Sequence, residues 1–184
     1  GVSPSVNVFI SSLRLAPAGS YGDFGQDAAT KLRIDRARLL SSAGFPDLAE
    51  TELRFAASTD SKPALLAIEL AQSAARRGAV DKSLRYIKSV SPGYLNWDLE
   101  SAPSAFWLLA FPMPFKQSLE KRSKENDLDP NMVAALVRQE SEFDPMAVSH
   151  ARAVGLTQVL PGTGREVSGK LGIRYRASML YQPD

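Results

Sequence analysis

The chain has 184 residues, of which 44% are hydrophobic and 23% charged, a balance that suits one large domain or two small ones. Its 22 Lys and Arg against 20 Asp and Glu leave a net charge of +2, too small and too evenly spread for a nucleic-acid-binding surface. Cysteine is absent, which excludes disulfides and thiolate metal sites, and no apolar run reaches the roughly 20 residues of a membrane span.

The first 30 residues are rich in Gly, Ser, Pro and Ala and show no sustained periodicity. We expect an extended lead-in over residues 1–30, without the basic and apolar regions of a signal peptide. From residue 31 to residue 90 the apolar pattern is helical and predicts four helices, with breaks at Gly44 and Gly78. Residues 31–111 are therefore interpreted as a scaffold of helical hairpins, and nothing in this region indicates catalysis.

Three positions in this region recur at a common offset of 34 residues, the period of tetratricopeptide-type helix-turn-helix arrays. The pairs are Ala37 and Ala71, Gly44 and Gly78, and Asp47 and Asp81. A chance match in a helical protein is the alternative, since the Trp and Tyr positions typical of such repeats are not evident. Either way, paired antiparallel helices that bury faces against one another predict a curved scaffold.

Prolines punctuate the chain between residues 103 and 114, so we place a domain boundary near residue 112. Four aromatic side chains gather at this boundary and have two interpretations. They could stack on sugars, but at such density beside a domain junction packing is favoured. They are Phe106, Trp107, Phe111 and Phe115.

Asp129 and Pro130 form a strong helix start, because Asp caps free amide groups and proline's missing N–H costs nothing at the first helical position. The helix that follows has an apolar stripe, and Glu140 occupies the position where the stripe should continue. The periodicity therefore predicts that Glu140 lies on the buried side. The stripe consists of Met132, Val133, Leu136 and Val137, and it resumes at Phe143.

In an apolar setting the charged form of a carboxyl group is disfavoured, so its pKa rises and it stays protonated near neutral pH. A general acid in glycosidic cleavage needs this property, because it protonates the departing bridging oxygen. The alternative is that Glu140 lies at the helix edge, where it reaches water or pairs with Arg138 or Arg152. The helix alone favours this alternative.

The chain after this helix contains small and polar residues at 147–154 and then the stretch 155–158. Gly155 would allow backbone to approach a ligand closely. Gln158 offers both a donor and an acceptor to sugar hydroxyl or acetamido groups. We therefore expect an irregular segment that crosses the domain beside the Glu140 helix.

Thr163 and Glu166 have the spacing of a capping box, which predicts that another helix starts at Thr163 and ends near Gly172. The single histidine, His150, has no second metal-type ligand nearby. Its interpretation is a polar loop residue, and no metal or cofactor is predicted.

The pattern from residue 112 onward extends over many positions in fixed order and spacing. They are Asp129, Pro130, Val133, Leu136, Val137, Arg138, Gln139, Glu140, Ser141, Phe143, Pro145, Ala147, Ser149, Gly155, Leu156, Gln158, Pro161 and Thr163. This pattern resembles the soluble lytic transglycosylase family over residues 112–184, and the region before it is similar to that family's superhelical N-terminal region. The resemblance implies an all-α protein in which helical hairpins precede the opening part of a lysozyme-like domain.

The resemblance also implies roles for individual residues. Glu140 would be the lone acid/base, and Ser141 would help to orient the glutamate or the ligand. The implied reaction cleaves the β-1,4 bond from N-acetylmuramic acid to N-acetylglucosamine in peptidoglycan, during cell-wall turnover. The muramic 6-hydroxyl attacks in place of water and leaves a 1,6-anhydro end. Substrate binding would fall to Ser141, Ser149, Gly155, Leu156, Thr157 and Gln158.

Two departures from the family pattern matter. Thr157 stands where many members have methionine, which predicts altered contacts with the sugar. The chain also ends at Asp184, before the family's third motif, so we expect only the N-terminal part of the catalytic domain and an incomplete substrate cleft.

The resemblance implies peptidoglycan glycan strands as the partner, further cell-wall proteins as possible partners of the scaffold, and a periplasmic or outer-envelope location. Two alternatives stay open. One is a hydrolytic lysozyme-like muramidase, in which water attacks instead of the 6-hydroxyl. The other is a noncatalytic helical scaffold that binds glycan or a partner protein.

Overall fold

The structure is a computed structural model and describes residues 23–59, 63–90 and 93–183. Within these ranges it contains eight α-helices and three 3-10 helices but no strand, so the predicted all-α class is confirmed. Two isolated β-bridges occur in the described part of the chain. None of its described helices is both long and apolar enough to span a membrane. Most of the predicted lead-in, residues 1–22, lies outside the described residues.

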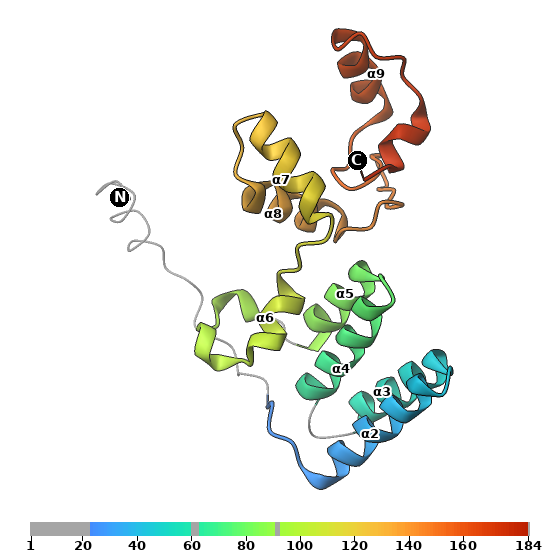
Figure 1. Ribbon diagram of the computed structural model, residues 1–184, viewed down its shortest axis with the longest axis vertical. Helices are drawn as coiled ribbons and strands as arrows, with labels where there is room; N and C mark the ends of the chain where they lie inside the picture. The colour runs from blue at the N-terminus through green and yellow to red at the C-terminus, as the bar shows by residue number, and fades with distance from the viewer. Residues whose placement is uncertain (1–22, 60–62, 91–92, 184) are drawn as a thin grey trace, which may run out of the picture.

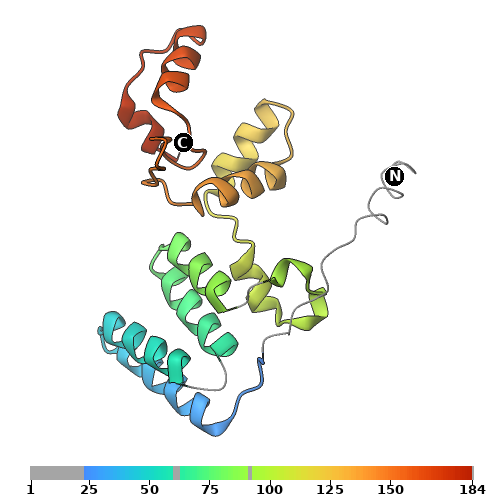
Figure 2. The same cartoon turned by 180° about the vertical axis from the view of Figure 1, so that it is seen from behind.

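The helices α2–α6 occupy one end of the longest axis and α9 the other, with α7 and α8 between them (Figure 1). The view from behind shows the same stacking (Figure 2). A scaffold of helices occupies one end, and a single connection leads from it to the second group. The scaffold helices are α2 (Ala28–Ser42), α3 (Pro46–Thr59), α4 (Pro63–Arg76), α5 (Val80–Val90) and α6 (Ser104–Ala110). The second group is α7 (Lys116–Glu125), α8 (Pro130–Ser141) and α9 (Pro161–Lys170).

The first four helices form two hairpins that turn in the same way. Gly44 and Gly78 both adopt the left-handed backbone, with φ of +86° and +76°. In each turn the amide after the glycine donates to the carbonyl oxygen five residues earlier, at 2.9 and 3.0 Å. This bond is the signature of a Schellman motif, in which glycine avoids the steric cost of a left-handed residue. The four predicted helices and both predicted breaks are therefore confirmed.

The other repeated positions are also equivalent in the two hairpins. Ala37 and Ala71 are both buried where the helices cross. Asp47 and Asp81 each lie in the first turn of the second helix of a hairpin, where a carboxylate stabilises the positive end of the helix dipole. The offset of 34 residues in the sequence therefore corresponds to a structural repeat.

Helix α4 is the centre of the scaffold, because it packs against α2, α3, α5 and α6. It buries leucine, isoleucine and several alanines, and the small alanines let neighbouring helices approach closely. One charged side chain, Glu69, is also buried here and is paired with Arg38, whose Nε donates to it at 3.2 Å. A buried carboxylate needs such a partner to offset the loss of hydration.

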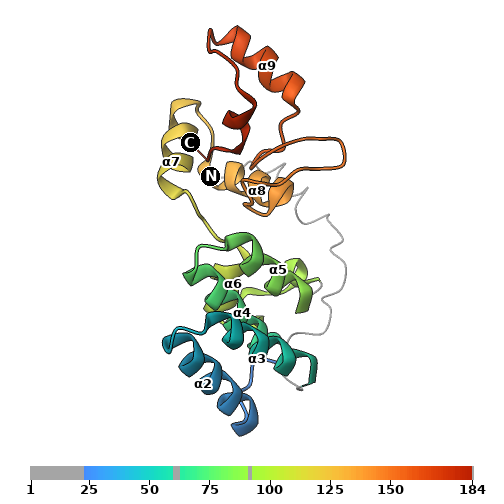
Figure 3. The ribbon, with the colours of Figure 1, turned by 90° about the vertical axis from the view of Figure 1, so that its right-hand side faces the viewer.

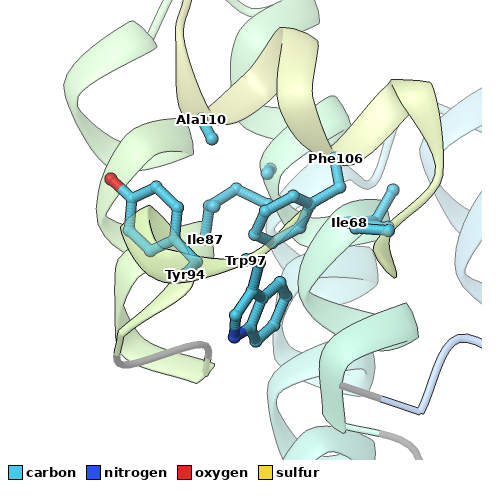
Figure 4. Close-up of a cluster of buried hydrophobic side chains, with 8 residues drawn as sticks. Ile68, Ile87, Tyr94, Trp97, Phe106 and Ala110 are labelled. Atoms are coloured by element: carbon cyan, nitrogen blue, oxygen red, sulfur yellow. The ribbon is translucent and has the colours of Figure 1, made fainter. Parts of the chain in front are cut away.

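Aromatic rings close the scaffold at the boundary with the second group (Figure 4). Phe106 is fully buried, stacks on Trp97 with ring centroids 5.5 Å apart, and meets the edge of Tyr94 at 5.8 Å. Trp107 packs against this cluster and stacks on Phe111. The packing interpretation is therefore right for Phe106 and Trp107, whereas half of the Phe111 side chain is exposed.

The second group has its own small core, made by Ala134, Val137 and Phe143. Helix α8 starts as predicted, since Asp129 accepts a hydrogen bond from the Asn131 amide at 2.7 Å and Pro130 is the first helical residue. The capping-box prediction for α9 is wrong. That helix begins at Pro161, two residues before Thr163, and it ends just before Gly172 as expected.

Candidate functional site

Helix α8 presents three rows of side chains to three different surroundings. Ala134, Val137 and Ser141 are buried in the core of the second group. Arg138 and Glu142 contact the scaffold. The third row faces water and consists of Met132, Leu136 and Glu140, spaced four residues apart.

The predicted burial of Glu140 is therefore wrong. Met132 is 73% exposed and Leu136 51% exposed, and Glu140 continues this open row. The apolar pattern of α8 is broad, and the small side chains of Ala134 and Val137 are the ones that face the core. The alternative placement, a glutamate that reaches water, agrees with the structure. No ion pair within the described residues involves Glu140, because Arg138 turns to another side of the helix.

Ser141 is buried and ties the end of α8 to the segment that follows. Its Oγ donates to the carbonyl oxygen of Leu156 at 2.9 Å and lies 3.2 Å from the carbonyl oxygen of Val137. The hydroxyl is thus committed to backbone atoms. Its observed role is to hold the 155–158 stretch against the last turn of α8, beside Glu140.

Arg138 reaches from α8 into the aromatic boundary of the scaffold. Its Nε donates to the carbonyl oxygen of Ala110 at 2.8 Å, and its guanidinium also donates to the Tyr94 hydroxyl. The guanidinium carbon lies 4.8 Å from the centre of the Phe111 ring, a cation–π contact. Figure 4 shows the Tyr94 hydroxyl pointing out of the aromatic cluster. Burial lowers the pKa of Arg138, and the nearby Glu142 carboxylate opposes that change.

Glu142 ends α8 and contacts helix α5 of the scaffold. Its carboxylate accepts a hydrogen bond from Arg85 Nε at 2.9 Å and another from Lys88. Burial acts to raise the pKa of Glu142, but the hydrogen bonds and positive charges of Lys88 and Arg85 outweigh it, so the pKa is lowered. Arg85 is also 3.3 Å from Asp81, one turn earlier on α5.

The segment from 147 to 159 is irregular, as expected, and two antiparallel bridges organise it, both made by Val154. Gly155 is required here for a reason other than ligand approach. Its φ is +79°, and a Cβ atom would lie 1.8 Å from the carbonyl oxygen of Leu180. The backbone that comes close to Gly155 is therefore the chain's own.

Gln158 also has a structural role that the sequence did not indicate. It lies in the left-handed region, with φ of +49°, and its Nε2 donates to the carbonyl oxygens of Gly155 at 2.9 Å and Ala147 at 3.2 Å. The amide nitrogen thus closes the turn. Ser149 is similar, because its Oγ accepts a hydrogen bond from the Ala153 amide at 3.0 Å.

Of the remaining predicted residues, Thr157 and His150 are exposed and Leu156 is partly buried against the core of the second group. Asp144, just before Pro145, forms a local turn, because its carboxylate accepts a hydrogen bond from the Met146 amide at 2.8 Å. In the described ranges, no group of three or more His, Cys, Asp or Glu side chains is placed to hold a metal ion.

One cavity lies beside α8, and Glu140 is not among the residues that line it. It has a volume of about 320 Å³ and is lined mostly by apolar side chains of α7, α8 and the 3-10 helix η3 (Ala177–Tyr181). Leu156 and Thr157 line it, whereas Glu140 does not. The structure thus brings Ser141 and the 155–158 stretch together, while Glu140 lies on the neighbouring open face.

Sequence reasoning missed that Arg138 and Glu142 join α8 to the scaffold. Both occur beside Glu140 in the sequence, but their partners lie 28 and 57 residues away, at Ala110 and Arg85. The one available signal was the i, i+4 spacing of these two oppositely charged residues.

Comparison with known proteins gives this geometry a family context. The family model described as Transglycosylase SLT domain matches residues 117–184. Membrane-bound lytic murein transglycosylase C of Actinobacillus pleuropneumoniae is 38% identical over 55 residues, 29% of this chain and 15% of that protein. The protein of the same name from Klebsiella pneumoniae is 39% identical over 69 residues, 35% of this chain and 19% of that protein. The chain thus spans less than a fifth of the curated relatives that it matches.

Two solved structures are similar over most of the chain. An inactive Glu-to-Gln mutant of the lytic transglycosylase Slt from Pseudomonas aeruginosa has a TM-score of 0.59 at 24% identity, covering 89% of this chain and 26% of that one. The 70 kDa soluble lytic transglycosylase of Escherichia coli has a TM-score of 0.57 at 20% identity, covering 98% of this chain and 28% of that one. These likenesses extend the shared fold from α7–α9 into the helical scaffold. The domain match assigns residues 117–184 to a transglycosylase SLT domain, and the solved structures show that the helices before it share the fold of these lytic transglycosylases.

Proposed function

We propose that the protein to which this chain belongs is a lytic transglycosylase of peptidoglycan, with Glu140 as its acid/base. The observation that carries the proposal is the pairing of an exposed carboxylate with an ordered loop. Glu140 stands on the open row of α8, and the Ser141 to Leu156 hydrogen bond holds the 155–158 stretch against the same helix turn. A glycan strand lying along α8 would meet both. A relative described as an inactive Glu-to-Gln mutant supports a catalytic glutamate in this family.

In the proposed reaction Glu140 protonates the bridging oxygen between N-acetylmuramic acid and N-acetylglucosamine as that bond breaks. The resulting carboxylate then removes the proton from the muramic 6-hydroxyl, whose oxygen bonds to the anomeric carbon and leaves a 1,6-anhydro end. One carboxyl group performs both steps in turn. Bound glycan would also cover Glu140 next to Leu136 and Met132 and so shield the reacting groups from water.

We infer further that the 155–158 stretch, Ser141 and Ser149 shape the glycan-binding surface. Because the side chains of Ser141, Ser149 and Gln158 already bond to backbone groups, their contribution is to hold the shape of the surface. Thr157 is exposed and is the member of the stretch that is free to touch sugar. From this substrate we infer a periplasmic or outer-envelope location and a role in cell-wall turnover, with cell-wall proteins as candidate partners of the scaffold.

We also propose the boundaries of the scaffold and of the catalytic domain. We assign residues 31–111 to the scaffold and 112–184 to the first part of the catalytic domain. The buried residues of the two cores next to the connection between α6 and α7 fall on opposite sides of it and support this division, with Val80 of α5 packed against the second core.

The test is to digest purified peptidoglycan with the full-length protein and with Glu140→Gln, and to weigh the products. We expect anhydro ends, which are lighter than hydrated ends by one water, and a rate at least ~100-fold lower in the mutant. Glu166→Gln is the matched control, because Glu166 is an exposed helical glutamate of the same domain that pairs with Lys170. Hydrated ends would indicate a hydrolytic muramidase. Wild-type activity in Glu140→Gln would remove Glu140 from the mechanism, and release of no glycan product by the wild-type protein would favour a noncatalytic scaffold.

A further inference from the structure

We propose that Arg138 and Glu142 are positioning residues, which attach one side of α8 to the helical scaffold and so fix the direction in which Glu140 points. This inference rests on the proposed role of Glu140. It further implies that the scaffold helps to orient the Glu140 carboxyl group.

The positions of the three residues on one helix support the inference. Arg138 and Glu142 are four residues apart and therefore lie on the same side of α8. Glu140 is two residues from each, so it projects from the opposite side. Fixing the Arg138 and Glu142 side of the helix thus fixes the rotation that turns Glu140 toward water.

The two attachments reach different parts of the scaffold. Arg138 bonds to the carbonyl oxygen of Ala110, at the end of α6, and lies over the Phe111 ring. Glu142 bonds to Arg85 and Lys88 of α5. The side view shows α8 facing the scaffold across this boundary (Figure 3). Two separated attachments resist both rotation of α8 about its axis and tilting of the helix, whereas one attachment would leave it free to swivel.

The attachment at Glu142 also controls how the chain leaves α8. Glu142 and Phe143 both have left-handed backbones, with φ of +55° and +65°, which non-glycine residues rarely adopt. Such residues persist where their surroundings hold them. Phe143 is held because it is buried in the core, and Glu142 is held by two cations of the scaffold. The reversal they produce brings Leu156 back to Ser141, directly beside Glu140.

On the scaffold side of this junction, the Arg85 side chain is held in position by neighbouring carboxylates. Arg85 is braced by Asp81, one turn earlier on the same helix, and Asp144 lies 3.8 Å from its guanidinium. The planar guanidinium of Arg138 suits its site for a different reason, since it donates along its edge while its face covers an aromatic ring. Lysine would keep the charge at that site but lose this geometry.

The experiment compares Glu142→Gln and Arg138→Lys with wild type in the full-length protein, by steady-state digestion of soluble peptidoglycan. A misdirected acid lowers the chemical rate more than substrate binding, so we expect kcat to fall roughly tenfold with KM within about twofold of wild type. Glu52→Gln is the matched control. It removes a similarly shielded glutamate that pairs with Arg33 and Arg36 of α2 inside the scaffold, and we expect wild-type kcat from it.

A charge exchange separates positioning from general loss of stability. Lys88→Glu alone puts a second carboxylate beside Glu142, and we expect it to lower kcat. Adding Glu142→Lys restores an attractive pair and should recover part of the lost kcat, even if either single variant is less stable. Wild-type kcat in folded Glu142→Gln and Arg138→Lys would overturn the inference, as would a rise of KM at unchanged kcat. Glu140→Gln in the same assay distinguishes failure of the positioning proposal from failure of the proposed function. Wild-type activity in that variant would overturn the proposed function itself.

Discussion

The Ser141 hydroxyl lies 2.9 Å from the carbonyl oxygen of Leu156 and donates a hydrogen bond to it across 15 residues of sequence. Glu140 immediately precedes Ser141, and Thr157 immediately follows Leu156. This one bond therefore sets the spacing between the proposed acid and the proposed glycan-binding stretch. Its partner atom belongs to the backbone, so the bond itself requires the serine hydroxyl but no particular side chain at position 156.

Replacing Ser141 by alanine should loosen this connection. We expect a loss of about 1 kcal/mol in the free energy of unfolding, because the Leu156 carbonyl loses its donor, together with a lower rate of glycan cleavage. Urea denaturation and peptidoglycan digestion measure the two effects. Ser178→Ala, at an exposed position of η3, is the control and should match wild type. A Ser141→Ala protein as stable as wild type would show that water replaces the lost bond at no cost.

A methyl group at position 155 should disrupt the turn that carries the proposed binding stretch. Gly155→Ala places a Cβ atom 1.8 Å from the Leu180 carbonyl oxygen, at a φ of +79°. We expect destabilisation of about 2–4 kcal/mol in chemical denaturation. Gly162→Ala provides the contrast, since Gly162 is helical with open space around it and alanine there should stabilise α9 by up to about 1 kcal/mol. Equal effects of the two substitutions would contradict this account.

Changing Gln158 to glutamate distinguishes a structural role from a sugar contact. The carboxylate cannot donate to the Gly155 and Ala147 carbonyl oxygens, so the turn should open and kcat should fall. Faster amide hydrogen exchange across residues 147–159 is the direct measurement. If exchange stays slow while KM rises, Gln158 acts mainly on the sugar.

Alkaline conditions should weaken the scaffold through Tyr86. Burial, with the hydrogen bond that Tyr86 donates to the Glu50 carboxylate, raises the pKa of Tyr86 from 10.0 to about 12. A folded-state pKa above the unfolded one gives stability that is fully present below pH 10 and is lost as pH rises through about 12. The free energy of unfolding should therefore decline across this window in wild type. In Tyr86→Phe the decline should be smaller, and an unchanged slope would assign the alkaline loss to other groups.

Local signals in the sequence predicted the ends of helices well. Gly44 and Gly78 marked both hairpin turns, and Asp129 with Pro130 marked the start of α8, because capping depends on neighbours in the chain. The Thr163 capping box failed for a related reason. Pro161 already supplied a favourable first helical residue, and α9 began there.

The orientation of α8 could not be predicted, because a broad apolar pattern gives the period of a helix but not which side faces the core. Met132 and Leu136 are larger than Ala134, yet they are the exposed pair. Which side is buried was decided by contacts with distant parts of the chain, such as the bond from Arg138 to Ala110. The resemblance to the family motif predicts the role of Glu140, while its exposure follows from this tertiary arrangement.

The direction of the Glu140 side chain also depends on how many residues precede it in α8. Each helical residue advances the side chains by about 100°, so one residue inserted between Asp129 and Glu140 would swing the carboxylate away from water while leaving composition and helix propensity nearly unchanged. Substitutions at Met132 or Leu136 change only the exposed row of side chains that a ligand would touch. The helix therefore tolerates changes of residue type on its open side far better than any change in length.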